Sequence, residues 1–463
     1  MSQQKRWEEL QEKHPSFTFS KFATEQINQD LQVSYYYSLA NNPEFIHQVT
    51  FKNFSFERWQ DQSEQLRQQL LFNLGLVEMF SYWKTTASAK IIIEAGELNN
   101  EQLKFWQELL QGGMGEFLYV NQLDPRVLQP NWQIQNESTS QANSATAQLE
   151  PSSSLVGIGG GKDSLVTTYL LNKANQSFDS LIIEPASPAT NSIAELFSNH
   201  NVIKIERRFD PQMLKLNHNG YLNGHVPFSA SAAFLGLISA VANGHQNFIV
   251  GNENSASEAT ATYETLTINH QYSKSFAFEK NFDQYCKQFI VNNVNYFSFI
   301  RPFYELKIAQ IFCSLPEEFL TSFRSCNRGQ KQGCWCGSCP KCLFVFLILA
   351  PFCDFDFLTN EIFHTNLFAN EKLIEDAKKL TGIISVKPLE CIGTIEESKV
   401  AFYLTLQKFI NENRALTPML ELAKTEIIDR ETDWEERVQK ILTHYETDNL
   451  LPTWAQEITK SLI

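Results

Sequence analysis

The chain has 463 residues, of which 43% are hydrophobic and 19% are charged, a balance typical of a globular protein with two or three domains. Its formal net charge is −14, and this acidity argues against a broad nucleic-acid surface, which needs clustered Lys and Arg. A local basic pocket for a small anionic substrate stays compatible with that charge.

The N-terminal segment as far as Phe17 lacks the apolar core of a signal peptide. The longest apolar run, Leu343 to Phe352, is far shorter than the roughly 20 residues of a membrane-spanning helix, so it predicts a buried helix. Nine cysteines without a signal peptide indicate reduced thiols or a metal site rather than a disulfide framework. We therefore expect a cytoplasmic protein with no membrane partner.

Residues 1–133 are expected to form an N-terminal domain of mixed α and β structure. Stretches rich in aromatic and β-branched residues predict strands at 17–22, 31–37 and 47–56. Apolar periodicity predicts helices at Glu64–Phe80 and Glu101–Leu110. Residues 134–153 are small and polar, can bury little surface, and are expected to be a linker between domains.

Residues 154–353 show a different pattern, in which short apolar runs alternate with helical stretches. The runs lie at 155–159, 180–185, 201–206 and 247–251, and the helical stretches at Asp163–Leu171, Asn191–Ser198 and Ser229–Ala242. Short buried strands alternating with helices predict the α/β class with a doubly wound parallel sheet. Residues 354–463 carry amphipathic segments and are expected to form a helical C-terminal region.

A glycine-rich run joins the first of these strands to its helix: Gly159, Gly160, Gly161, Lys162, Asp163 and Ser164. Glycines let the backbone approach an anion closely, and the amides at a helix start hold phosphate oxygens. Lys162 can add positive charge, Asp163 can hold Mg²⁺ beside the phosphates, and Ser164 can donate a hydrogen bond. The run therefore predicts a phosphate-binding loop.

Two common phosphate loops do not match this run. A Walker A loop needs Ser or Thr after its Gly-Lys pair and an earlier glycine, but Asp163 and Val156 occupy those positions. A dinucleotide fingerprint that starts at Gly157 needs a third glycine where Lys162 stands. The run is instead similar to the phosphate loop of the ATP pyrophosphatase (PP-loop) superfamily, which cleaves ATP between its α and β phosphates.

Further polar segments follow the later elements. Gly251, Glu253 and Glu258 lie after the strand that ends near Val250, at the edge of the sheet where open α/β folds bind ligands. Other groups able to move protons or to bind carboxylates and phosphates follow in the order His270, Tyr272, Lys274, Arg301, Cys326 and Arg328.

Taken in chain order, the segments GIGGGKDS, GNENSASE, NHQYSKS, RPFYEL, SCNR and WCGSCPKCLFVF resemble the UDP-N-acetylmuramoyl-L-alanyl-L-glutamate epimerases of the MurL type. The resemblance covers most of residues 154–353. It implies an enzyme that uses ATP and Mg²⁺ to invert the terminal L-glutamate of a UDP-muramoyl dipeptide. AMP and pyrophosphate would be released in the synthesis of peptidoglycan precursors.

The resemblance also suggests roles for the candidate residues. ATP would contact Gly159 to Ser164 and Gly251, and Asp163 would also hold Mg²⁺. Candidate proton carriers are Glu253, Glu258, His270, Lys274 and Cys326. Substrate would contact Glu258, Tyr272, Arg301 and Arg328.

Four cysteines have spacing suited to tetrahedral zinc: Cys326, Cys336, Cys339 and Cys342. The 7-cyano-7-deazaguanine synthases carry a similar arrangement that holds zinc. A zinc-bound Cys326 could not transfer protons, so these two hypotheses compete. Partly buried free thiols are the alternative to a zinc site.

Three other functions are compatible with parts of the sequence. A deazaguanine-type synthase would activate a carboxylate and then add ammonia, and a tRNA-modifying pyrophosphatase would need RNA. A zinc-stabilised interaction module would use no ATP, although the intact glycine loop argues against it. The oligomeric state is open.

Overall fold

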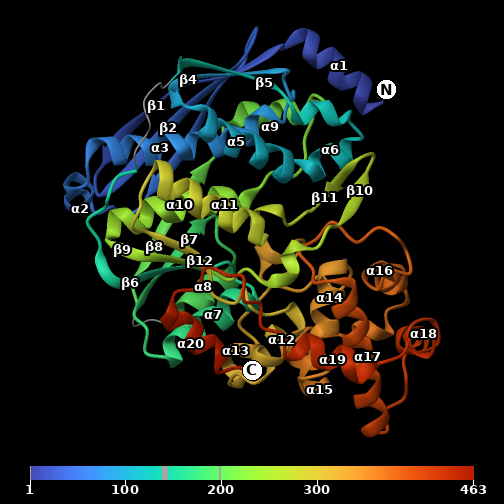
Figure 1. Cartoon of the computed structure of the whole chain (residues 1–463). Coiled ribbons are helices and arrows are strands. Elements are labelled where there is room, and N and C mark those ends of the chain that lie inside the picture. The colour runs from blue at the N-terminus through green and yellow to red at the C-terminus, as the bar shows by residue number, and fades with distance from the viewer. Residues whose placement is uncertain (1, 138–143, 198–199) are drawn as a thin grey trace.

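The computed structural model of this protein describes residues 2–137, 144–197 and 200–463. Ten strands form one sheet in the order β12-β9-β6-β7-β8-β3-β2-β1-β4-β5, and helices pack on both of its faces (Figure 1). The strands are β1 (Ser16–Ile27), β2 (Asp30–Leu39), β3 (Glu44–Phe51), β4 (Lys90–Leu98), β5 (Asn131–Glu137), β6 (Glu150–Gly157), β7 (Phe178–Glu184), β8 (Val202–Arg208), β9 (His245–Val250) and β12 (Asn295–Ser298). A separate hairpin joins β10 (Ala261–Tyr263) to β11 (Leu266–Ile268).

Five parallel strands, β8-β7-β6-β9-β12, form one half of the sheet. The chain builds outward from β6 in one direction and then, from β9, in the other, so the order reverses between β6 and β9. Helices α10 (Phe228–Asn243) and α11 (Phe276–Phe289) lie on one face, and α7 (Lys162–Lys173) and α8 (Pro188–Leu196) lie on the other (Figure 1). The predicted α/β class with a parallel sheet is thereby confirmed.

The N-terminal strands extend the same sheet. Strand β3 pairs with β8 in antiparallel fashion, with Val49 opposite Arg207. In β2 every second side chain is buried, from Leu31 to Leu39, because successive residues of a strand point to opposite faces. One continuous sheet therefore contains strands from before and from after the segment 134–153. The division into domains at that segment stays a prediction.

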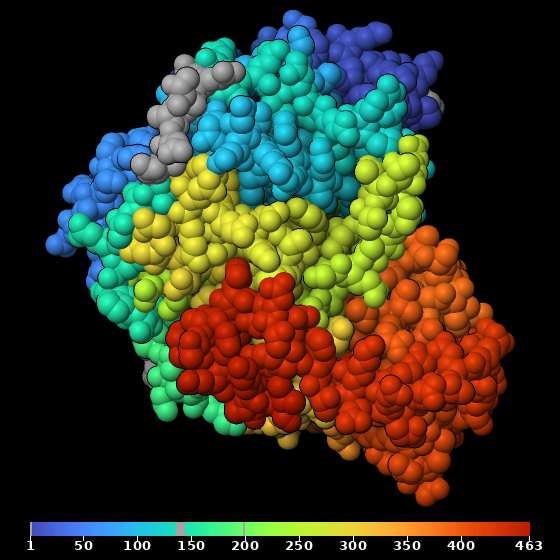
Figure 2. All heavy atoms as spheres, viewed as in Figure 1, coloured from blue at the N-terminus to red at the C-terminus, as the bar shows by residue number. Residues whose placement is uncertain are grey.

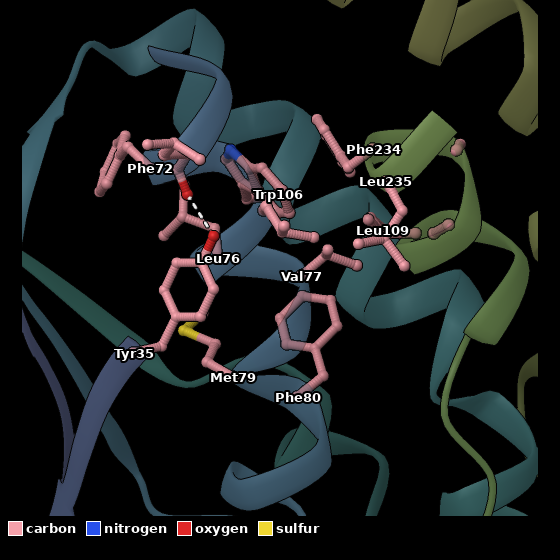
Figure 3. Packing of buried hydrophobic residues seen from close by; sticks show 14 of the residues in the cluster. Tyr35, Phe72, Leu76, Val77, Met79, Phe80, Trp106, Leu109, Phe234 and Leu235 are labelled. Carbon is pink, nitrogen blue, oxygen red and sulfur yellow. Dashed lines mark hydrogen bonds between the residues drawn. The ribbon is translucent and has the colours of Figure 1, made fainter. Parts of the chain in front are cut away.

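The described residues form two hydrophobic cores, and one of them lies between the sheet and a layer of helices (Figure 3). Helix α3 (Glu64–Glu78) begins at Ser63, whose hydroxyl accepts a hydrogen bond from the amide of Leu66 at 3.2 Å. Its buried face meets α5 (Asn100–Gly113) and α10, where Val77, Trp106 and Phe234 lie close together in Figure 3. These helices come from both sides of the segment 134–153.

The boundaries of several elements differ from the expectations. Strands β5 and β6 extend into both ends of the expected linker 134–153, while residues 138–143 lie outside the described residues. Helix α8 ends at Leu196, and Ser198 also lies outside the described residues. Helix α9 (Pro211–His218), the β10–β11 hairpin and α11 were not anticipated.

The C-terminal region is helical, as expected, and forms a lobe beside the sheet (orange and red in Figure 2). Its helices within 354–463 are α15 (Phe355–Phe357), α16 (Ile374–Leu380), α17 (Ile395–Asn411), α18 (Pro418–Glu426), α19 (Trp434–Leu442) and α20 (Thr453–Lys460). They follow α12 (Glu305–Cys313), α13 (Glu317–Leu320) and α14 (Pro340–Leu349) in the chain. Helix α14 is buried from Lys341 to Leu349, which confirms the buried helix predicted there. Each large apolar side chain in it contributes roughly 1.5–3 kcal/mol by leaving water.

A disulfide joins Cys313 at the end of α12 to Cys353, which follows α14. The expectation that the cysteines are reduced or bind metal is therefore wrong for this pair, while the other seven cysteines are free. No helix in the described ranges combines the length and apolar character that crossing a bilayer requires.

A buried ion pair links the N-terminal helices to the parallel half of the sheet. The Nε and Nη2 atoms of Arg207 on β8 donate to the Glu78 carboxylate at the end of α3, at 3.1 and 2.6 Å, and His47 Nε2 lies 3.2 Å from the same carboxylate. Burial alone would raise the pKa of Glu78, but the charges of Arg207 and His47 outweigh it and lower the pKa to about 2. The ion pair thus needs an ionised Glu78.

We predict that Glu78→Gln lowers the apparent free energy of unfolding by about 3–5 kcal/mol, because it leaves the Arg207 charge buried without a partner. Since the folded pKa is depressed, this stabilisation is complete above pH 4.5 and is lost as the pH falls toward 2. Urea unfolding followed by circular dichroism at several pH values measures both effects. Asp356→Asn, which removes an exposed partner of Arg414, is the matched control and should leave the midpoint unchanged. Equal midpoints for Glu78→Gln and wild type would contradict the prediction.

Candidate active site

A cavity of about 780 Å³ lies at the carboxyl ends of β6, β7 and β9, where the strand order reverses. Open α/β sheets bind ligands at such a reversal, because the loops from neighbouring strands diverge there. Lys341 from α14 and Cys391 from the helical C-terminal region complete the wall. The cavity therefore lies between the parallel sheet and the C-terminal lobe.

The glycine loop after β6 forms the floor of this cavity. Gly161 caps α7 without a side-chain hydrogen bond, so the amides of the first turn stay available to an anion. Gly160 has a φ of +81°, and a Cβ there would meet Thr190 Oγ1 at 2.7 Å. A Cβ on Gly159 would meet nothing within 4 Å. Gly160 thus turns toward α8, and Gly159 faces open space.

Three carboxylates meet beside the loop. Oxygens of Asp163, Glu253 and Glu305 lie within 4.8 Å of one another, a spacing that one metal ion could bridge. The ammonium of Lys162 contacts Asp163 and Glu305. Burial, with the charge of Asp163 beside it, raises the pKa of Glu305 to about 7, and the same two causes raise the pKa of Glu253. Three converging carboxylate oxygens form a set that suits a hard divalent cation.

A second group of polar side chains lies around Lys274 and Cys391, which both line the cavity. The Lys274 ammonium donates to Cys391 Sγ at 3.4 Å, and His270 Nε2 lies 3.7 Å from the same sulfur. The other ring nitrogen of His270 contacts Glu116 in α6 (Gly115–Asn121). Burial alone would lower the pKa of His270, but its hydrogen bonds with Cys391 and Glu116 raise it to about 9. The Cys391 thiol therefore lines the cavity, with Lys274 and His270 beside its sulfur.

The cysteine cluster lies at the start of α14. The sulfurs of Cys326, Cys336, Cys339 and Cys342 are within 4.8 Å of one another. The amides of Gly329 and Cys336 donate to Cys326 Sγ at 3.2 and 3.4 Å. Four converging sulfurs with backbone donors form a set suited to tetrahedral zinc.

The predicted site residues fall into groups. Those that line the cavity are Gly159, Gly161, Asp163, Ser164, Gly251 and Lys274. Glu253 and Lys162 join Asp163 in the charged cluster, and His270 stands behind Cys391. A Cβ on Gly251 would lie 3.0 Å from Asp163 O, so this glycine allows β9 to end against the first turn of α7.

Arg301 does not fit its predicted role in binding a substrate anion. Its side chain is 0% exposed, forms an ion pair with Glu279 at 2.7 Å, and donates to the carbonyls of Glu253 and Lys274. With its donors occupied inside the protein, Arg301 positions the two segments that carry Glu253 and Lys274.

Three other predicted substrate contacts are not among the residues that line the cavity. Glu258 pairs with Lys387 at 2.7 Å, the Tyr272 ring packs against Gly112, and Arg328 is exposed. Cys326 belongs to the cysteine cluster, and burial raises the pKa of its thiol, which disfavours the thiolate that proton transfer needs. The predicted contacts of Glu258, Tyr272 and Arg328 with substrate therefore stay predictions.

Sequence reasoning missed three groups of the site. Glu305 was noticed only as part of a motif, and nothing in its spacing from Asp163 shows that both reach one point. Lys341 was hidden inside the cysteine motif, and Cys391 stands alone in a stretch without a pattern. Only the fold brings these residues to the cavity.

Comparison with known proteins gives consistent matches. The family model for the MurL N-terminal domain matches residues 8–299, and that for the MurL C-terminal domain matches residues 322–437. Relatives from Xanthomonas oryzae pv. oryzae and Salinispora tropica, 34% and 32% identical over 341 residues, are each named UDP-N-acetyl-alpha-D-muramoyl-L-alanyl-L-glutamate epimerase. Both alignments cover 72% of this chain, and they cover 74% and 72% of the two relatives. No solved structure matches.

The two glycines of the loop allow a paired test. Gly160→Ala should lower the melting temperature and abolish nucleotide binding, because a Cβ at a φ of +81° would collide with Thr190. Gly159→Ala should keep the wild-type melting temperature, since its Cβ meets only open space, and should weaken ATP binding by at least about 10-fold if phosphates occupy that space. Differential scanning fluorimetry and isothermal titration calorimetry measure the two properties. Wild-type ATP affinity in Gly159→Ala would show that phosphates do not approach the loop from this side.

Proposed function

The chain belongs to the MurL family of epimerases, and from this premise we propose that it uses ATP to invert the terminal L-glutamate of UDP-N-acetylmuramoyl-L-alanyl-L-glutamate. The product would be the D-glutamate form, a precursor of peptidoglycan. The observation that carries the proposal is the glycine loop beside three clustered carboxylates at the reversal of a parallel sheet.

The chemistry explains why an epimerase would need ATP. A free carboxylate resists loss of the neighbouring α-proton, because the resulting carbanion lies beside a negative charge. Joining the carboxylate to AMP removes that charge and makes the carbonyl an electron sink, so a side chain can take the proton. Cleavage between the α and β phosphates releases pyrophosphate, and hydrolysis of the acyl-adenylate then releases AMP and the D-glutamyl product.

The loop residues have roles in this scheme. The amides from Gly159 to Ser164 would hold the phosphates, as in the PP-loop superfamily, and the Lys162 ammonium would add positive charge. Asp163, Glu253 and Glu305 would hold Mg²⁺, which neutralises phosphate charge. The carboxylates that compete for Lys162 in the free protein would then be shared with the metal ion.

The substrate carboxylate would lie beside Lys274 and Lys341. Both lysines line the cavity and carry positive charge suited to an acid group. The cavity volume of about 780 Å³ is within the ordinary range for small-molecule sites. The loop amides would thus bind the phosphates of ATP, and the two lysines would bind the carboxylate of the substrate.

Incubation with ATP, Mg²⁺ and the L-glutamyl dipeptide nucleotide in deuterated water tests the proposal. We expect AMP, pyrophosphate and a D-glutamyl product that carries deuterium at the α-carbon. Dependence on ammonia would indicate a synthase instead, and dependence on RNA would indicate tRNA modification.

Asp163→Asn and Glu305→Gln should each lower the rate of AMP formation by at least about 100-fold while the fold stays intact, since even outer-shell partners of a metal ion contribute 10- to 100-fold. Asp429→Asn, at an exposed position in the C-terminal lobe, is the matched control and should keep the wild-type rate. Normal turnover in Asp163→Asn would contradict the metal role.

We further propose that the four-cysteine cluster holds a structural zinc ion, for which the converging sulfurs are the support. The purified protein should then contain about one zinc ion per chain by mass spectrometry of the metal, and Cys339→Ser should lose it. Cys334→Ser, at an exposed thiol outside the cluster, should keep it. A protein without zinc, or equal losses in both variants, would refute the proposal.

A further inference from the structure

Cys391 occupies an unusual position among the nine cysteines. Two of the others form the disulfide, four form the cysteine cluster, Cys334 is exposed, and Cys286 is buried in the core. Cys391 alone lines the cavity, and its sulfur lies 3.4 Å from the Lys274 ammonium and 3.7 Å from His270 Nε2. A cation and an imidazole thus converge on one thiol at the cavity wall.

The segment that carries Cys391 is held from several directions. The carbonyl of Cys391 accepts a hydrogen bond from Lys341, and the carbonyl of Ile392 accepts one from the Gln271 side chain at 2.9 Å. Lys387 donates to Glu258 at 2.7 Å. These contacts join the C-terminal lobe to the segments after β9 and β11, so the thiol is fixed relative to the glycine loop.

The charges around the sulfur favour its ionised form. Burial alone would raise the pKa of the Cys391 thiol, but the Lys274 ammonium and the hydrogen bond from His270 outweigh it and lower the pKa to about 6. Lys341 adds a further positive charge, while the acids near these groups are Glu390, Glu116 behind His270, and Asp163 and Glu253 beyond Lys274. Lys274 and His270 contact the sulfur itself.

We propose that Cys391 is the base that removes the α-proton of the activated glutamyl residue, with Lys274 and His270 as the groups that position and stabilise its thiolate. This inference rests on the proposed function, because it needs a glutamyl carboxylate joined to AMP in the adjoining cavity.

The step balances in atoms and electrons. The α-carbon–hydrogen bond breaks, its proton bonds to Cys391 Sγ, and its electron pair moves into the carbonyl of the acyl-adenylate to give an enolate. Water in the cavity then delivers a proton to the opposite face of the α-carbon, which restores the carbonyl in the D configuration. The thiol returns its proton to solvent before the next turnover.

Cys391→Ser and Cys391→Ala test the proposal through two separate readouts. Exchange of labelled pyrophosphate into ATP reports adenylate formation, and deuterium at the α-carbon reports proton removal. We expect both variants to keep pyrophosphate exchange within about threefold of wild type, and to lose deuterium incorporation and D-product formation by at least about 100-fold, as for loss of a general base. Retained pyrophosphate exchange also shows that the variants are folded.

The outcomes separate this inference from the proposed function. A wild-type protein without pyrophosphate exchange on this substrate would contradict the function itself. D-product formation within threefold of wild type in Cys391→Ala would overturn the assignment of Cys391 alone. Deuterium uptake into L-substrate recovered from the Cys391→Ala reaction, without epimerisation, would also overturn it, because another group would then remove the proton.

The pH profile adds a readout that a purely structural cysteine would not move. The wild-type kcat/KM for epimerisation should rise with pH and level off above the Cys391 pKa of about 6, since the base must be ionised. Lys274→Met removes the nearby positive charge, so the rising part of the profile should move to higher pH. An unmoved profile in Lys274→Met would contradict a thiolate stabilised by Lys274.

Discussion

The meeting of three carboxylates, two of them buried, beside the Lys162 ammonium is the interaction on which the rest of the site depends. Asp163 comes from the first turn of α7, Glu253 from the loop after β9 and Glu305 from the start of α12. Lys162, which is 2% exposed, contacts two of them. Because like charges repel strongly away from water, this arrangement favours the binding of a further positive charge beside the phosphate loop. A metal ion bound with a nucleotide would supply that positive charge. Nucleotide binding would then also reduce the repulsion among the three carboxylates.

The site also depends on helices and segments that follow the sheet in the chain. Helix α12 brings Glu305 to the cluster, α14 brings Lys341, and the segment before α17 brings Cys391. Arg301 ties the segments of Glu253 and Lys274 together from inside the protein. The cavity thus depends on contacts between parts of the chain that are far apart in sequence, and a nucleotide-binding sheet alone would lack both the third carboxylate and the thiol.

The sequence allowed good prediction wherever the signal was local. Strand patterns, the glycine loop and the buried run of α14 each follow from neighbouring residues, and the structure places helices and strands there. The continuous sheet could not be foreseen, because the pairing of β3 with β8 joins residues more than 150 positions apart. Arg301 was misjudged because an arginine that pairs with buried Glu279 and one that binds a substrate look alike in sequence. Cys391 lay in a segment without periodicity, so only its neighbours in space reveal it.

The central claim is that the glycine loop serves to join the glutamyl carboxylate to AMP. It is tested most directly with substrate whose terminal α-carboxylate carries ¹⁸O. If a carboxylate oxygen attacks the α-phosphate and water later cleaves the acyl bond, mass spectrometry should find one ¹⁸O atom in the released AMP. Epimerised product accompanied by unlabelled AMP would contradict the account.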